Sequence, residues 1–208
     1  MKRRGLFLIA ATGFIFLAAC NNGENTVKDA NDSNSMKMDT TKMDTTRNDT
    51  THGGTSSIAP PVSEKDTKFM TAAANGGMME VALGNVAETN GMNQRVKDFG
   101  KMMVDEHSKA NEEMKSLAIR KNVTLPAALK GSDQSHVDKM SKKNGKNFDK
   151  DYIDMMVSDH KKDIKEFEDE QANGSDPDLK DFITKILPTL RKHLDSAQAI
   201  QSALKGKM

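Results

Sequence analysis

The strongest constraint on the fold is a short sequence that occurs twice. Residues 102–109 read MMVDEHSK and residues 155–162 read MMVSDHKK, an offset of 53 residues. Around both copies, apolar residues recur at three- and four-residue spacing, which predicts amphipathic helices. The same spacing places His107 and His160 on the apolar faces of those helices. Two long helices, each with an inward-facing histidine, are therefore expected to meet in one bundle.

Helical spacing of apolar residues continues through the chain beyond residue 62. It predicts four long helices at about residues 64–90, 93–122, 147–173 and 177–205, and a short helix within 133–142. The Asn-Gly pairs at 90–91 and 173–174 are typical helix stops, and Asp176-Pro177 is a typical helix start. The sequence shows no alternation typical of a β-strand, so the predicted fold class is all-α.

Tight turns join the long helices into two hairpins, residues 64–122 and 147–205. The connection between them, residues 123–146, is long enough to cross the bundle. Two hairpins with one crossover give the connectivity of a ferritin-like four-helix bundle, here with the short extra helix in the crossover.

The repeat also predicts how the two hairpins are related. Its offset of 53 equates the second helix of the first hairpin with the first helix of the second hairpin. A weaker match at an offset of 113 equates the two remaining helices, because it pairs Phe69 with Phe182 and Glu80 with His193. The hairpins are therefore expected to be related by an approximate two-fold axis in swapped order.

The N-terminus predicts export and a lipid anchor. Residues 1–19 combine a basic head, an apolar run and small residues, which is the pattern of a signal peptide. Leu17-Ala18-Ala19-Cys20 resembles a bacterial lipobox, which implies cleavage before Cys20 and acylation of that residue. Several acyl chains anchor a protein to a membrane stably. The alternatives are an ordinary signal peptide and a membrane anchor, although the apolar run is short for a span. Asn21 after the cysteine favours the outer membrane of a Gram-negative cell, facing the periplasm or the cell surface.

Residues 20–62 are predicted to be a disordered tether between the lipid and the domain of residues 63–205. Polar and small residues dominate this segment, so it cannot bury enough apolar surface to offset the entropy of ordering. A five-residue unit recurs in it as KMDTT, KMDTT and RNDTT, from residue 37 to residue 51. The unit is interpreted as a solvated spacer, and two alternatives stay open. The Asp-Thr-Thr triplets resemble an O-glycosylation signal, and Met36, Met38, Met43 and His52 offer soft ligands for Cu(I).

Charge and cysteine content exclude several functions. The formal net charge is +1, and without the three basic residues of the signal peptide it becomes −2. The sequence therefore lacks the basic field expected of a nucleic-acid-binding protein. One cysteine permits no intrachain disulfide. The sequence leaves open a protein partner and a homo-oligomer.

Several segments together resemble a known family. They are GGMMEVALGNVAETN, VKDFGKMMVDEHSKANEEMKSLA, FDKDYIDMMVSDHKKDIKEFE and DPDLKDFITKILPTLRKHLDSA. The resemblance is to the bacterial envelope family known as domain of unknown function 4142, which is considered ferritin-like, and it covers about residues 64–203. It implies a helical bundle, export and often a lipid anchor, and it brings no established activity. The recurring polar positions of the family fall here on Glu80, His107, His136, His160 and His193.

Four polar residues on the inward faces are the candidate metal ligands. Glu80, His107, His160 and His193 each lie on a different long helix. The predicted stripe of the first helix is Phe69, Ala73, Gly76, Glu80, Leu83 and Ala87. An unpartnered polar group in a core costs about 1–3 kcal/mol, so the four groups should bind one another, water or a metal ion. Imidazole is the commonest metal ligand, and the candidates are iron, manganese, zinc and copper.

Other residues are predicted to support these ligands. Asp105, Glu106 and Asp159 are close enough in sequence to orient the histidines as hydrogen-bond acceptors. Met103 and Met156 precede His107 and His160 by four residues, and a thioether next to an imidazole favours copper. His136 lies in the crossover, and Asp133-x-x-His136 is the nearest match to the Glu-x-x-His pair of di-iron proteins. A carboxylate-bridged di-iron site is therefore not predicted.

Three interpretations follow, and the sequence does not decide between them. The preferred one is a non-catalytic envelope lipoprotein whose Glu/His cluster binds a transition metal. The second is a structural or interaction module in which the same cluster forms only internal hydrogen bonds. The third is a metal-dependent redox enzyme.

Overall fold

The computed structural model describes residues 61–129 and 131–206, and these residues are helical almost throughout. The helices are α2 (Glu64–Asn90), α3 (Gln94–Arg120), α4 (Gly131–Ser141), α5 (Gly145–Asn173) and α6 (Pro177–Lys205). No strand occurs in the part of the chain that the structure describes. The predicted all-α class is confirmed, with helix boundaries within about two residues of those expected.

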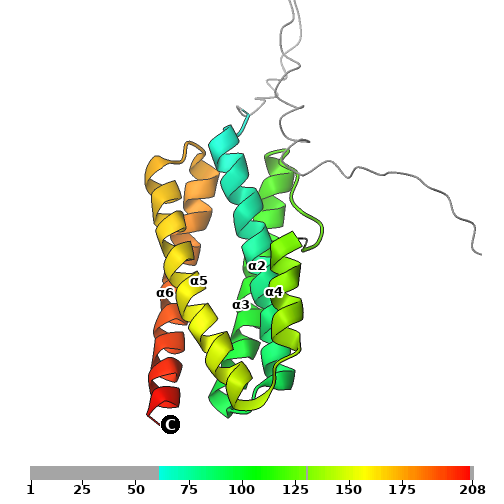
Figure 1. Ribbon diagram of the computed structural model, residues 1–208. Coiled ribbons are helices and arrows are strands. Elements are labelled where there is room, and N and C mark those ends of the chain that lie inside the picture. Colours follow the sequence, from blue (N-terminus) through cyan, green and yellow to red (C-terminus); the bar gives the residue numbers. More distant parts are fainter. Residues whose placement is uncertain (1–60, 130, 207–208) are drawn as a thin grey trace, which may run out of the picture.

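The helices form two hairpins that lie side by side. In Figure 1, α2 and α3 form one hairpin, α5 and α6 form the other, and α4 runs along α2 as part of the crossover. Helices α2 and α6 run downward in that view, whereas α3 and α5 run upward. This is the predicted four-helix bundle with a short extra helix in the crossover.

Each hairpin begins with an aspartate that binds the turn of the other hairpin. Asp66 in the first turn of α2 accepts hydrogen bonds from the backbone N–H groups of Ser175 (3.1 Å) and Asp176 (2.9 Å). Asp149, just after the first turn of α5, accepts from the backbone N–H groups of Met92 (2.9 Å) and Asn93 (2.8 Å). Both aspartates are buried. The two contacts fix the hairpins against each other at opposite ends of the bundle.

These contacts show a relation between the hairpins that the sequence analysis did not predict. Asp149 follows Asp66 by 83 positions. The turn residues 175–176 follow the turn residues 92–93 by the same number. The helix stops obey this offset as well, because the N–H groups of Gly91 and Gly174 bond to the carbonyls of Ala87 and Glu170. The hairpins are thus related in chain order, α2 with α5 and α3 with α6. The residues matched by the MMV repeat also occupy similar places in the bundle, because Met103 and Met156 lie in one hydrophobic cluster and His107 and His160 meet in one group.

The core consists of two hydrophobic clusters along the bundle. The lower cluster of Figure 1 includes Leu83, Met103 and Met156, and the upper cluster includes Ala74, Met114 and Leu187. On α3, His107 lies between Met103 and Met114, and on α2 Glu80 lies between Ala74 and Leu83. A buried polar layer therefore separates the two clusters at the middle of the bundle.

The predicted inward stripe of α2 is only partly correct. Glu80, Leu83 and Ala87 are buried as expected, but between Phe69 and Gly77 the buried residues are Met70, Ala74 and Gly77. The predicted positions Phe69, Ala73 and Gly76 are one residue earlier and partly exposed, because they line an open cavity between α2 and α5. Periodicity alone does not distinguish a cavity wall from a close-packed face.

The predicted signal peptide, Cys20 and nearly all of the tether lie outside the described residues. None of the helices within residues 61–129 and 131–206 is long and apolar enough to cross a membrane.

Replacing Asp66 with alanine should lower the free energy of unfolding by about 2–3 kcal/mol at pH 7, because buried N–H donors lose a charged acceptor. Burial alone would raise the pKa of Asp66, but the donors of Ser175 and Asp176 lower it below its usual value. This lowered pKa stabilises the fold above about pH 4, and the stabilisation is lost as the pH falls. Urea unfolding should therefore show a smaller difference in the free energy of unfolding between the wild type and Asp66→Ala at pH 2.5 than at pH 7. Asp181→Asn, an exposed site on α6, is the control, and a pH-independent difference would contradict the capping role.

Candidate metal centre in the polar layer

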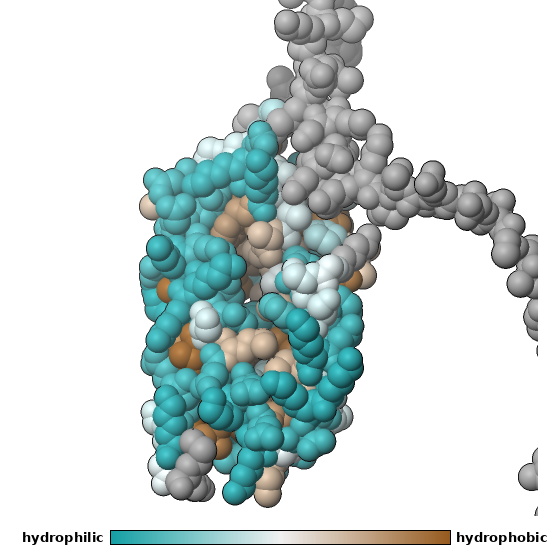
Figure 2. All heavy atoms as spheres, viewed as in Figure 1, coloured by the Kyte–Doolittle hydropathy of each residue, from teal (hydrophilic) through white to brown (hydrophobic). Residues whose placement is uncertain are grey.

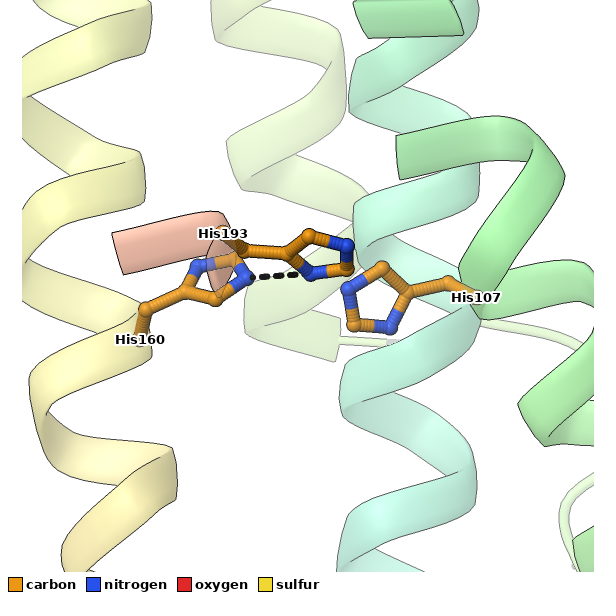
Figure 3. Close-up of side chains that lie close together, drawn as sticks. All are labelled: His107, His160 and His193. Carbon is orange, nitrogen blue, oxygen red and sulfur yellow. Dashed lines mark hydrogen bonds between the residues drawn. The ribbon is translucent and has the colours of Figure 1, made fainter. Parts of the chain in front are cut away.

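The structure brings together the four polar residues that the sequence singled out. Glu80 comes from α2, His107 from α3, His160 from α5 and His193 from α6. At most 6% of any of the four residues is exposed. The helical stripes place them at one level of the bundle, and Figure 3 shows the three imidazole rings directed toward one another.

The carboxylate of Glu80 contacts the Nδ1 atoms of two histidines. Its Oε2 lies 3.0 Å from His107 Nδ1, and its Oε1 lies 3.3 Å from His160 Nδ1. His160 Nδ1 is also 3.0 Å from the carbonyl oxygen of Met156 and is hydrogen-bonded there. Glu80 Oε1 consequently has no hydrogen-bond partner, and neither has the buried His107 Nε2.

A second chain of contacts links the cluster to the surface. His160 Nε2 lies 3.2 Å from His193 Nδ1, the contact dashed in Figure 3. His193 Nε2 lies 2.9 Å from Glu106 Oε2, and the other oxygen of Glu106 accepts from Lys192 Nζ at 2.9 Å. Glu106 therefore holds the outer nitrogen of His193 in the way expected of a carboxylate behind a metal-binding histidine.

The inner ring nitrogens have a spacing that suits a metal ion. Each of His107, His160 and His193 offers one ring nitrogen, and the three nitrogens lie within 4.8 Å of one another. Two nitrogens bound tetrahedrally at about 2.0–2.1 Å would be about 3.3 Å apart, close to the His160–His193 contact. The nitrogen of the third ring lies within 4.8 Å of the other two and would have to come closer for one ion to bind all three. Within the described residues, this is the group of metal-ligating side chains that meets that spacing.

The electrostatics of the pair Glu80 and His107 require a positive charge in the layer. Burial alone would raise the pKa of the Glu80 carboxyl, but the three histidines lower it to about 2, with His107 the strongest. Burial also opposes a charge on His107, but the Glu80 carboxylate outweighs it and raises the pKa of His107 above its usual value. Glu80 is thus a buried anion, and a proton on His107 or another cation must balance it.

The other two histidines are held uncharged. Burial lowers the pKa of His160, and burial together with the neighbouring rings lowers the pKa of His193 to about 4. A carbonyl and a carboxylate only accept, so at neutral pH His160 Nδ1 donates to Met156 and His193 Nε2 donates to Glu106. The two inner nitrogens then face each other at 3.2 Å with lone pairs only. A proton or a metal cation between them is needed to make that contact favourable.

The sequence and the fold are both similar to those of known proteins. The model of the family described as domain of unknown function (DUF4142) matches residues 53–200. This chain belongs to that family. No curated protein matches the sequence. A crystal structure of a DUF305 fragment from Deinococcus radiodurans is similar, with a TM-score of 0.61 and 10% sequence identity, and it covers 69% of this chain and 99% of that chain. At this identity the likeness concerns the fold alone.

The remaining predicted site residues of this family member lie in different surroundings. Asp105 is exposed and pairs with Lys101 at 2.7 Å, so it points away from the histidines that it was expected to orient. His136 is exposed on α4. Met103 and Met156 belong to the lower hydrophobic cluster, and Met156 contacts the site through its carbonyl oxygen.

Two features of the site were not predicted, namely Asp163 and the carbonyl oxygen of Met156 as an acceptor. Asp163 and Asp159 are one turn apart on α5 and line the cavity that reaches Glu80 and His107. Burial and the Glu80 charge raise the pKa of Asp159 to about 6 and that of Asp163 to about 7. The four-residue spacing from Asp159 was the available sequence signal for Asp163. The carbonyl acceptor of Met156 has no sequence signal, because every residue carries one.

Replacing Glu80 with glutamine in metal-free protein should lower the free energy of unfolding by about 3 kcal/mol, because it leaves His107 without its buried partner. The lowered pKa of Glu80 stabilises the fold above about pH 4.3, and the raised pKa of His107 stabilises it below about pH 6.5. The difference should therefore be largest between these values and smaller at pH 2.5 and pH 9. Urea unfolding in EDTA measures it, and Glu113→Gln on the exposed face of α3 is the control. A constant difference at all pH values would contradict the ion pair.

Proposed function

We propose that this protein binds one transition metal ion in the polar layer of its bundle, through His107, His160 and His193, without catalysing a reaction. The observation that carries the proposal is the orientation of the three rings. Each outer nitrogen has an acceptor, respectively Glu80, the Met156 carbonyl and Glu106, and the inner nitrogens converge. Such acceptors fix the tautomer and leave the inner lone pair for a metal.

Glu80 has a different role in this proposal from the one expected of a direct ligand. It contacts the Nδ1 atoms of His107 and His160, whereas in Figure 3 His107 directs Nε2 toward the other rings. Its carboxylate orients His107 and supplies the negative charge that favours a cation. Direct coordination through the free Oε1 would require the side chain to turn.

The donor set narrows the choice of ion. Three imidazole nitrogens suit zinc, copper, iron or nickel better than the hard cations calcium and magnesium, which prefer oxygen ligands. Manganese is less favoured by the same reasoning. The site lacks the bridging carboxylates of a di-iron centre, because in the described residues the converging group consists of histidines.

A metal-free structural layer is the second candidate. The pairs Glu80–His107 and His193–Glu106 already give several buried polar atoms a partner inside the protein. Such a layer would fix the register of the four helices without a ligand, as buried polar groups do in some bundles. It leaves the buried His107 Nε2 without a partner, which a cation bound by the three rings would change.

The metal proposal predicts about one equivalent of a transition metal in full-length protein purified in detergent without chelator or affinity tag. The variant His107→Leu/His160→Leu should lose the metal, because two of three imidazole ligands are gone. The exposed His136→Ala should keep it and is the matched control. Mass spectrometry measures the content, and reconstitution with Co²⁺ gives a visible absorption band that reports the coordination geometry.

Two results would contradict the proposal. One is the absence of metal from the wild type even after reconstitution with iron, manganese, zinc and copper, in which case the structural layer is the better account. The other is equal metal content in the wild type and the double variant, which would place the metal elsewhere.

We further propose that the bundle is a lipid-anchored protein of the bacterial envelope. Support comes from the lipobox-like sequence that ends at Cys20 and from the polar segment of about forty residues between that cysteine and α2. Such a segment would let the bundle stand away from the membrane surface.

The anchor predicts that Cys20→Ser moves the protein from the membrane to the soluble fraction, or leaves the signal peptide uncleaved, because the acylated sulfur is missing. Fractionation and immunoblotting in a Gram-negative host test this. Asn21→Asp is the control, since it keeps the acylated cysteine and should stay in a membrane fraction. Processed Cys20→Ser protein that remains in the membrane would overturn the lipid anchor.

A further inference from the structure

A cavity leads from the surface to the polar layer. It has a volume of about 280 Å³, lies between α2 and α5, and reaches Glu80 and His107. In Figure 2, apolar atoms are exposed in a hollow on this face, surrounded by hydrophilic side chains. One water occupies about 30 Å³ of the liquid, so the cavity has room for an ion that keeps several of its waters.

The wall of the cavity is acidic. Asp159 and Asp163 line it from α5, together with Glu166, and Asp133 lines it from α4. The lining also contains Lys162, whose ammonium group pairs with Glu166 at 3.6 Å. The charge of Lys162 also acts on Asp159 and Asp163, but the four carboxylates of this wall outnumber the one ammonium group. A concave surface lined by charges of one sign concentrates ions of the opposite sign, in this case cations.

The deep end of the cavity carries ligand atoms without partners. Glu80 Oε1 and His107 Nε2 are both buried and lack a hydrogen bond, and both residues line the cavity. Only 2% of Glu80 is exposed, so water around the protein does not satisfy this oxygen. A cation that travels down the cavity would meet these atoms first in the polar layer.

A glycine keeps one wall of the cavity open. A side chain at Gly77 or Gly84 would collide with α3, since an added Cβ would lie 2.2 Å from Asn111 Oδ1 or 2.7 Å from the carbonyl of Gly100. Close helix contact explains these two glycines. An added Cβ at Gly76 would meet nothing within 4 Å, and Gly76 lines the cavity. Glycine is a poor helix former, so its presence at position 76 is accounted for by the space that it leaves.

We propose that this cavity is the access route by which a divalent transition-metal cation reaches the three histidines, with Asp159 and Asp163 as transient ligands on the way. The inference rests on the proposed function, because it assigns a route to the metal site described above. It adds a second, oxygen-lined position to the nitrogen site and gives Gly76 a role in loading.

The route can be tested by filling it. In metal-free full-length protein in detergent, stopped-flow absorbance follows the binding of Co²⁺. Gly76→Leu should slow loading at least ten-fold, while the final absorbance band stays unchanged because the three histidines are intact. Gly76→Ala is the matched control, since it makes the same change in backbone preference but leaves most of the space, and it should load within two-fold of the wild type.

The acidic wall is tested separately. Asp159→Asn/Asp163→Asn should slow Co²⁺ loading about five-fold at pH 8 and low salt, and the remaining rate should depend less on salt. Asp98→Asn/Glu113→Gln removes two exposed carboxylates outside the cavity and should leave the rate unchanged.

The outcomes separate this inference from the proposed function. If the wild type binds no Co²⁺, both fail. If the wild type binds Co²⁺ and Gly76→Leu loads at the wild-type rate, the access route is wrong and the metal site stands. If Gly76→Leu also weakens the absorbance band, the access route is judged from Asp159→Asn/Asp163→Asn instead. An unchanged loading rate in that variant overturns the access route.

Discussion

The contact between Glu80 and His107 lies between two hydrophobic clusters, where an uncompensated charge is very unfavourable. The carboxylate keeps its charge because the surrounding imidazoles lower its pKa. Each further property of the layer follows from this buried anion. It raises the pKa of His107, it adds to the effect of burial in raising the pKa values of Asp159 and Asp163 across the cavity, and it makes the centre of the bundle attractive to cations.

A site of this kind requires four helices in one axial register. The two hairpins are fixed against each other at both ends, by Asp66 on the α5–α6 turn and by Asp149 on the α2–α3 turn. Because the contacts are reciprocal, a slip of one hairpin along the other would break both. Near the middle, Gly84 and Gly100 allow α2 and α3 to approach closely, next to Glu80. Rigid elements that are held at both ends position ligands more precisely than loops do.

The sequence predicted the layer but not its internal geometry. Three-and-four spacing of apolar residues was sufficient for the helices, the crossover and the four inward polar residues, because these depend on local periodicity. The reciprocal aspartate contacts depend on how two hairpins meet, and an Asp near a helix start looks the same whether it caps its own helix or a distant turn. The offset of 83 was visible only in the paired Asn-Gly stops, and the more conspicuous MMV repeat pointed to a different alignment. Which nitrogen of each histidine faces inward also depends on the tertiary structure.

The negative charge of Glu80 in the polar layer can be balanced either by a proton or by a metal ion. Without a metal, Glu80 raises the pKa of His107 and thereby favours a compensating proton there, and the two hydrophobic clusters lie on either side of the layer. The bundle therefore does not depend on an ion for its core, in contrast to small zinc domains that fold only with metal. A bound metal ion would take over from the proton in balancing the charge of Glu80. The hydrogen bonds to the outer ring nitrogens of the three histidines would already be present. The binding energy of the ion would not be consumed by folding, so loading and release would leave the bundle intact, which is the behaviour expected of a reversible metal-binding protein and not of a structural metal site.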